Sequence, residues 1–377
     1  MFLKPDEYTL LMAQEGLARN LSLDNLKRLR DAGVQTVYQL FYWQDWEPEP
    51  SNFNWAAIDT DLESAQRAGL KTILVGPCDG PPGYPLEWYS ADADGAPMCG
   101  LPRGGHTWYS LSPWHPEARQ LTLERIELVM RARACDTVLC ARGGQHSGES
   151  LLPYDPVEGA FYDPAALLSY QNYAKAYYDG DLAGYWQENS NWTHPYTWQD
   201  VRPTALSWTP TEPPRARCTI AWLRESLIHA ALAEQELYAG QGCEILFMLQ
   251  HAWDSIWATG NPFAHTLYAE AAHRFTNPLT IINYSRFDPH ILAEPILTKL
   301  SYGDLAFGDL LVGSEFCEGL RDNTAEVIRD GLRGTLTAPL SHMTNHAILE
   351  DWMVDTFVQA NAQWRAHFKE ESHDTQE

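Results

Sequence analysis

Apolar positions along the chain switch between a period of about two and a period of about 3.6, which predicts alternating strands and helices. The first unit has an apolar strand at 8–12 and a helix that Ser22 caps and a glycine ends. A second helix over 55–68, again ended by a glycine, separates the strands predicted at 34–40 and 70–75. Two successive helix–glycine–strand joints are typical of a parallel sheet covered by helices.

The alternation continues to the end of the chain. Further strands are expected at 136–141, 244–249, 279–283, 310–313 and 335–338, and further helices at 117–133, 164–178, 219–239 and 347–368. Two segments rich in proline and aromatic residues, 76–114 and 186–214, read as long loops, which are usually functional in a compact domain. Eight strands with intervening helices and no linker predict one (β/α)8 TIM barrel over 1–370, followed by a frayed acidic tail at 371–377.

Composition adds two features to this picture. The 377 residues include 15 Trp and 18 Tyr, which either fill a large core or line a cleft where sugar rings stack on flat aromatic faces. The formal net charge of −24 repels nucleic acid and anionic membranes, so neither is an expected partner. This charge suits a neutral or cationic substrate, a carbohydrate is the expected partner, and barrels of this kind often form homo-oligomers.

Cysteine usage and the N-terminus bear on the compartment. The seven Cys show no CxxC spacing, and the four in apolar segments, Cys135, Cys140, Cys218 and Cys243, are interpreted as small buried hydrophobes in a reducing compartment. The first residues lack the apolar run of a signal peptide, so we expect a cytoplasmic protein. His146 and His251 have no closely spaced ligand partners, so we expect neither a metal nor another cofactor.

Two glutamates follow predicted strands. In such barrels the active site lies at the carboxyl ends of the strands. Glu149 follows the fourth predicted strand and Glu315 the seventh, with Glu318 as a rival for Glu315. Glycoside hydrolysis needs two carboxyls that flank the scissile bond, one to protonate the leaving oxygen and one to attack the sugar or activate water. This pair therefore predicts a glycosidase.

Six motifs in a fixed order then carry a resemblance. They are DAGVQTVY at 31–38, WQDWEPEP at 43–50, FNWAAID at 53–59, AGLKTILVGP at 68–77, GPPGYPLEWY at 80–89 and DG at 94–95. This part of the chain resembles the opening of the family-42 β-galactosidases and their clan-A relatives. The resemblance covers about 20–115 well and the remainder by strand order.

The resemblance assigns roles to the two glutamates. It implies that Glu149 is the acid/base and Glu315 the nucleophile of a retaining, exo-acting enzyme on a β-galactoside or a related hexoside. The family has Asn-Glu at the fourth strand, whereas this chain has Ser147-Gly148-Glu149. That motif, with the Leu-Leu-Pro-Tyr after it, is closer to the acid motif of the inverting β-amylases, so an inverting mechanism is the alternative.

Other polar and aromatic residues fall at or near predicted strand ends. The expected substrate-binding residues are Trp43, Glu47, Asp79, Trp88, Trp108, Arg142, Gln250, His251, Trp253 and Tyr284. Some have a structural alternative: the tryptophans as core, Glu47 as a structural residue, Asp79 as a solvated loop charge and Tyr284 as packing. Tyr284 is the candidate to hydrogen-bond the nucleophile, and Arg142 the candidate to lower a neighbouring carboxyl pKa.

Three other functions stay open. An inverting β-amylase-like hydrolase would hold its carboxyls farther apart than a retaining enzyme does. A non-catalytic carbohydrate-binding barrel would keep the aromatic cleft and lack turnover. A barrel isomerase is the most distant option, because the glycine-rich phosphate loops and metal-ligand clusters that many such enzymes use are absent from the sequence.

Overall fold

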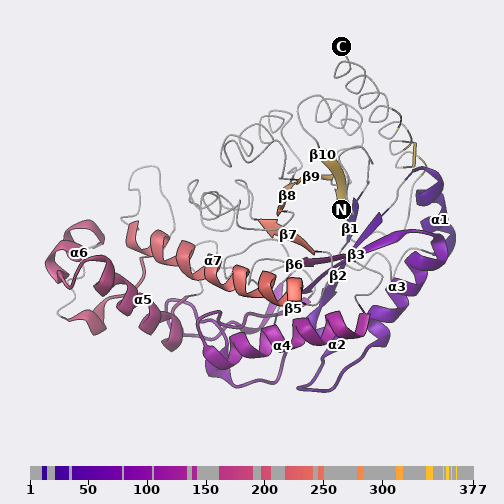
Figure 1. Ribbon diagram of the computed structural model, residues 1–377. Coiled ribbons are helices and arrows are strands. Elements are labelled where there is room, and N and C mark those ends of the chain that lie inside the picture. The colour runs from indigo at the N-terminus through magenta and orange to yellow at the C-terminus, as the bar shows by residue number, and fades with distance from the viewer. Residues whose placement is uncertain are drawn as a thin grey trace, which may run out of the picture.

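The computed structural model covers residues 1–377 (Figure 1). It describes 11–14, 22–33, 36–78, 80–103, 106–133, 138–141, 161–189, 197–204, 217–240, 245–249, 278–283, 311–316 and 337–342, with residues 351, 354, 355, 358 and 362. None of the helices described in these parts is long and apolar enough to cross a bilayer.

Eight strands pair in parallel and close into a ring. They are β1 (Leu11–Gln14), β2 (Thr36–Tyr42), β3 (Lys71–Cys78), β6 (Val138–Ala141), β7 (Ile245–Leu249), β8 (Pro278–Asn283), β9 (Leu311–Phe316) and β10 (Thr337–His342). The order around the ring is β1-β10-β9-β8-β7-β6-β3-β2, with β2 paired back to β1. Each expected barrel strand therefore has its counterpart, and chain order is followed around the sheet.

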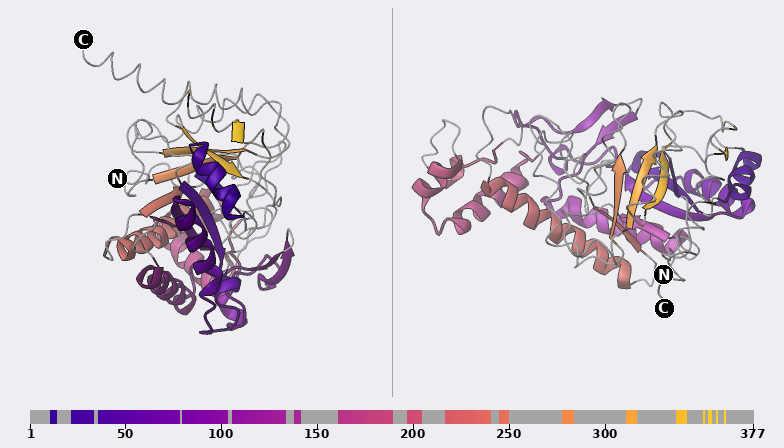
Figure 2. Two further views of the ribbon diagram at one scale, coloured as in Figure 1. Left: turned by 90° about the vertical axis from the view of Figure 1, so that its right-hand side faces the viewer. Right: turned by 90° about the horizontal axis from the view of Figure 1, so that it is seen from above.

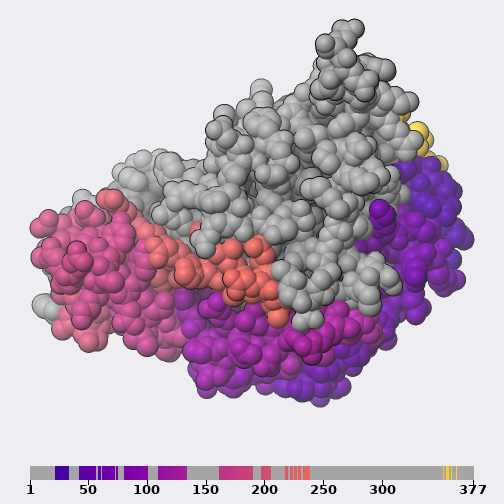
Figure 3. Space-filling view, viewed as in Figure 1, coloured from indigo at the N-terminus to yellow at the C-terminus, as the bar shows by residue number. Residues whose placement is uncertain are grey.

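Helices cover the ring on the sides where they are described. They are α1 (Leu23–Asp31), α2 (Trp43–Trp46), α3 (Ala56–Ala68), α4 (Pro116–Arg133), α5 (Pro164–Tyr177), α6 (Leu182–Asn189) and α7 (Arg217–Gly240). The helix α1 packs beside α3, and α4 packs beside α7 (Figure 1). Helices α5 and α6 extend away from the ring (Figure 2) and form the protrusion at the left of Figure 3.

Local chemistry sets the ends of several helices. The Ser22 side chain accepts a hydrogen bond from the N–H of Asn25 and begins α1. Gly69 ends α3 in the left-handed conformation, with φ of 79°. Asp163 caps α5, where Pro164 occupies the first turn. Helix ends predicted from the sequence were accurate because each signal acts within a few residues.

Strand ends were predicted less well. The seventh strand was expected at 310–313, but β9 runs to Phe316, so Glu315 lies within the strand and not after it. Gly313 and Ser314 interrupt the apolar pattern, yet pairing with β8 and β10 on both sides continues through them. The length of β9 is set by its pairing with the two neighbouring strands, and a local sequence pattern carries no information about that pairing.

The two segments read as loops contain short elements. The segment 76–114 holds η1 (Leu86–Trp88) and a hairpin of β4 (Cys99–Arg103) with β5 (His106–Tyr109). The segment 186–214 begins inside α6 and holds η3 (Trp198–Asp200). The expected helix at 347–368 is described only at five helical positions, where Asp351 forms an ion pair with Arg28 of α1.

Many aromatic side chains belong to the core. The largest fully buried side chains among the described residues are Trp43, Trp46, Trp222, Tyr89, Tyr170 and Phe161. These six side chains are core residues, and none of them has a surface for a ligand. Aromatic residues that are half-buried or exposed keep a surface that a ligand could contact.

Candidate active site

The carboxyl end of β9 carries Glu315. Its backbone pairs with Asn283, the last residue of β8, and with Leu340 of β10. It is the second-to-last residue of the seventh strand in the ring. The strand therefore brings this glutamate to the rim of the barrel, where the carboxyl ends of all eight strands meet.

Most of the other predicted residues lie outside the described part of the chain. These are Glu149, Asp79, Arg142, Gln250, His251, Trp253, Tyr284 and the rival nucleophile Glu318. Glu149 comes eight positions after Ala141, the last residue of the fourth barrel strand. Trp108 lies in β5, where its backbone pairs with Leu101. The roles expected for these residues stay predictions.

Hydrogen bonds hold Tyr162 and Asp163, which lie just before α5. The N–H of Tyr162 donates to the carbonyl of Ala91, in the loop after β3, at 3.0 Å. Asp163 beside it is buried and accepts from the N–H groups of Ala165 and Ala166 at the start of α5. Burial raises the pKa of Asp163, against these hydrogen bonds. A backbone hydrogen bond thus joins the loop after β3 to the residues just before α5.

Glu47 is buried where the loop after β2, the loop after β3 and α4 meet. It has no exposed surface and follows β2 and α2. Its carboxylate accepts from the Trp43 indole at 2.7 Å, the Ser51 backbone N–H at 2.7 Å and the Tyr84 hydroxyl at 2.9 Å. Arg125 of α4 donates from Nε to Oε2 at 2.9 Å and from Nη2 to Oε1 at 3.0 Å. This two-pronged ion pair links α4 to the loops after β2 and β3.

These contacts keep Glu47 ionised. Burial alone raises its pKa, but the hydrogen bonds from Arg125, Trp43, Ser51 and Tyr84 outweigh burial and leave the pKa below its ordinary value of 4.5. Of the two roles considered for Glu47, this geometry gives the structural one. Trp43 is also fully buried, in line with the core alternative for the tryptophans.

The ion pair supports an aromatic platform. Tyr84, whose hydroxyl is held by Glu47 and Arg125, stacks on Trp88 with ring centroids 5.6 Å apart and an angle of 21°. Trp88 also contacts the ring of His115 at 5.8 Å. Trp88 remains half-buried, so part of its indole is open to a ligand. Among the predicted stacking residues whose side chains the structure describes, Trp88 is the one with an accessible ring surface.

Sequence reasoning missed Arg125 and Tyr84. Arg125 occupies the same helix face as Leu121 and Val129, four positions before and after it, and both are buried. An arginine in that register is a signal for a buried partner. The partner itself, 78 positions away, has no local signature. No cluster of metal-ligating side chains occurs in the part of the chain that the structure describes.

Comparison with known proteins gives one family match. The family model described as β-galactosidase, glycoside hydrolase family 42, matches residues 15–94. This stretch contains α1, α3 and the loop with Tyr84 and Trp88. No curated protein matches the chain.

Solved structures match over nearly the whole chain. The catalytic domain of β-amylase from Paenibacillus polymyxa is 12% identical with a TM-score of 0.61, covering 94% of this chain and 98% of its own. The family-42 β-galactosidase Gan42B from G. stearothermophilus is 12% identical with a TM-score of 0.64, covering 95% and 57%. The β-galactosidase from Bacillus circulans sp. alkalophilus is 13% identical with a TM-score of 0.62, covering 91% and 51%.

This chain therefore spans a little over half the length of the β-galactosidases that it matches. At 12–13% identity the structural likeness establishes the fold, which is that of TIM-barrel glycoside hydrolases. The predicted resemblance to family-42 and clan-A glycoside hydrolases, including a β-amylase, is confirmed, and the family match supports a glycosidase.

Proposed function

We propose that the chain is a glycosidase that cleaves its substrate with Glu315 and Glu149 at the rim of a single (β/α)8 barrel spanning 1–370. The main observation behind this proposal is that Glu315 lies at the carboxyl end of the seventh strand in a closed ring of eight strands. The family match over 15–94 supports the same class from an independent part of the chain.

The leading mechanism is retaining, on a β-galactoside or a related hexoside. Glu315 attacks the anomeric carbon and forms a glycosyl ester, while the glycosidic C–O bond breaks and Glu149 gives its proton to the leaving oxygen. Glu149 then takes a proton from water, which cleaves the ester and restores both carboxyls. Glu149 needs a raised pKa for its first role, so that it is protonated near neutral pH.

The second candidate is an inverting, β-amylase-like hydrolysis of an α-glucan. One observation favours it: the β-amylase catalytic domain is matched over 98% of its length, whereas the β-galactosidases are matched over little more than half of theirs. In this mechanism Glu315 activates a water molecule instead of attacking the sugar. Carboxyls about 5–5.5 Å apart correspond to retention, and about 6.5–9.5 Å to inversion.

The test is hydrolysis of a panel of p-nitrophenyl glycosides and of maltotetraose by the wild type, Glu315→Gln and Glu318→Gln. We expect turnover by the wild type and by Glu318→Gln, and a loss of about three orders of magnitude or more in kcat for Glu315→Gln. NMR of the first-formed anomer then distinguishes retention from inversion.

Two outcomes would overturn the proposal. Equal activity of Glu315→Gln and the wild type would remove Glu315 from the mechanism. Sugar binding by the wild type without turnover of any substrate would favour a non-catalytic carbohydrate-binding barrel.

A further inference from the structure

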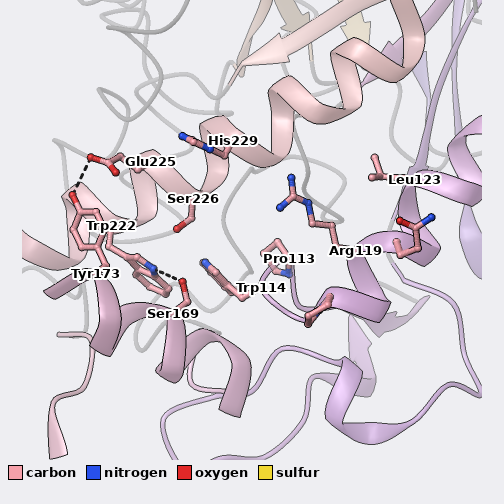
Figure 4. A pocket seen from close by; sticks show the side chains of 12 residues that line it. Pro113, Trp114, Arg119, Leu123, Ser169, Tyr173, Trp222, Glu225, Ser226 and His229 are labelled. Carbon is pink, nitrogen blue, oxygen red and sulfur yellow. Dashed lines mark hydrogen bonds between the residues drawn. The ribbon is translucent and has the colours of Figure 1, made fainter. Parts of the chain in front are cut away.

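A groove of about 780 Å³ lies outside the ring of strands, between α4, α5 and α7 (Figure 4). Its volume is in the range of about 300–1,000 Å³ that is typical of small-molecule sites. Its lining residues come from α4, α5, α7 and the loop before α4, and none belongs to a strand of the ring. Nothing in the proposed hydrolysis uses it.

An aromatic pair forms one side of the groove. The indoles of Trp114 and Trp222 stack with centroids 4.6 Å apart and an angle of 18°. Trp222 is fixed in place: it is 1% exposed and its Nε1 donates to the Ser169 hydroxyl at 3.0 Å. Trp114 is half-buried and adds an apolar surface held rigidly from behind. A rigid aromatic surface binds a ligand without the entropic cost of ordering a flexible side chain.

Polar groups around this surface lack protein partners. The Nε1 of Trp114 is buried and has no acceptor among the described residues. Arg119 comes from α4, and Ser226 and His229 come from α7, so three polar side chains face one space (Figure 4). Within the described part of the chain, Arg119 forms no ion pair.

The charges of the groove favour a neutral ligand. Arg119 is cationic, whereas Glu225 across the groove is anionic and accepts from the Tyr173 hydroxyl at 3.1 Å. A ligand of either sign would meet one like charge, and the net charge of −24 further opposes an anion. A neutral ligand with hydroxyls gains from both groups, because each hydroxyl donates and accepts.

We propose that this groove is a second carbohydrate-binding site, in which a neutral oligosaccharide rests on Trp114 and hydrogen-bonds Arg119, Ser226 and Glu225. The proposed function supplies the class of ligand, and the groove supplies the site. The apolar C–H faces of a sugar match the aromatic surface, while its hydroxyls match the mixed donors and the carboxylate. The site would hold a chain outside the barrel while the rim acts on the same or another chain.

The test observes the groove directly, by the indole N–H resonance of Trp114 in a ¹⁵N-labelled protein. The protein is the full chain with Glu315→Gln, so that probes are not consumed if the rim is catalytic. The resonance is assigned by its loss in Trp114→Phe, which keeps an aromatic ring against Trp222. The probes are maltotetraose, cellotetraose, xylotetraose and lactose, each titrated separately.

We expect at least one probe to shift the Trp114 resonance saturably. Arg119→Met should weaken that binding about tenfold, the effect of losing a hydrogen bond from a charged group. The matched control is Arg131→Met, on the same helix, where the exposed Arg131 pairs only with Glu127 among the described residues; its affinity should equal that of the parent.

Three results would overturn the inference: no saturable shift with any of the four probes, equal affinity in Arg119→Met and its parent, or an equal loss in Arg131→Met. The readout is binding and not turnover. If no sugar binds in the groove, the result of the hydrolysis test is unaffected. If no substrate is hydrolysed, the result of the binding test is unaffected.

Discussion

Arg125 and Glu47 form a buried, two-pronged ion pair across 78 positions of sequence, with Nε 2.9 Å from Oε2 and Nη2 3.0 Å from Oε1. The pair is also reached by the Tyr84 hydroxyl, which lies 3.1 Å from Arg125 Nη2. Through Tyr84 it sets the position of Trp88, the half-buried indole of the aromatic platform. The loop that carries Tyr84 and Trp88 is therefore anchored by a buried ion pair.

Removing the charge of Glu47 should destabilise the fold. In Glu47→Gln the carboxamide keeps the shape of the side chain but leaves Arg125, only 13% exposed, without a countercharge. Breaking a buried pair by changing one partner costs about 3–5 kcal/mol in the free energy of unfolding. Urea unfolding at neutral pH measures this loss.

A more exposed pair on the same helix gives the control. Arg133 of α4 pairs with Asp59 of α3, and the two side chains are 27% and 37% exposed. Asp59→Asn should cost no more than about 1 kcal/mol, because water screens this pair. Equal losses in the two variants would contradict the role given to burial.

The contribution of Glu47 should depend on acidity. Its pKa in the folded protein is lowered, so its stabilising effect is fully present above its ordinary value of 4.5 and is lost as the pH falls through the lowered value. The difference in unfolding free energy between the wild type and Glu47→Gln should therefore be constant from pH 7 to about pH 5 and shrink below 4.5. A difference that grows as the pH falls below 4.5 would show that folding raises the pKa of Glu47 instead of lowering it.

Two glycines in the loop after β3 should respond differently to alanine. Gly83 and Gly95 both have positive φ, 80° and 82°. A Cβ on Gly83 would lie 2.9 Å from Cδ of Pro50, whereas a Cβ on Gly95 would meet nothing within 4 Å. Gly95→Ala should cost about 1 kcal/mol for the backbone conformation alone, and Gly83→Ala about 2 kcal/mol or more.

Thermal unfolding of the two glycine variants makes the comparison. The shift in Tm should be larger for Gly83→Ala. Equal shifts would mean that the ring of Pro50 moves aside at no cost.

Trp88 should contribute to substrate affinity if the proposed hydrolysis is correct. Trp88→Ala removes the exposed part of the platform, while Tyr84 keeps its bonds to Glu47 and Arg125. Stacking of one ring is worth about 1–2 kcal/mol, so KM should rise about tenfold with a smaller change in kcat.

Leu86, in the same short turn and 59% exposed, provides the matched control. Leu86→Ala should leave KM unchanged. A similar rise in KM for both variants would point to a general loosening of the turn and not to stacking on Trp88.

Several elements were predictable because their signals are local. The helices α1, α3, α4, α5 and α7 follow from apolar periodicity and from caps such as Ser22 and Gly69. Six motifs within about 65 residues indicated the family that the comparison then matched over 15–94. The hairpin of β4 and β5 was not predicted, because its pairing involves a proline- and glycine-rich stretch with no clear alternation.

The sequence by itself determined the order of strands and helices and the strand that carries Glu315, since both depend on residues a few positions apart. Only the tertiary structure decided that β9 runs through Glu315 to Phe316, because the two neighbouring strands supply the hydrogen bonds there. It also decided that Glu47 is buried and paired with Arg125. The cost of burying a carboxylate is met by Arg125, Trp43, Tyr84 and Ser51 together, and their meeting at one point is a property of the folded chain.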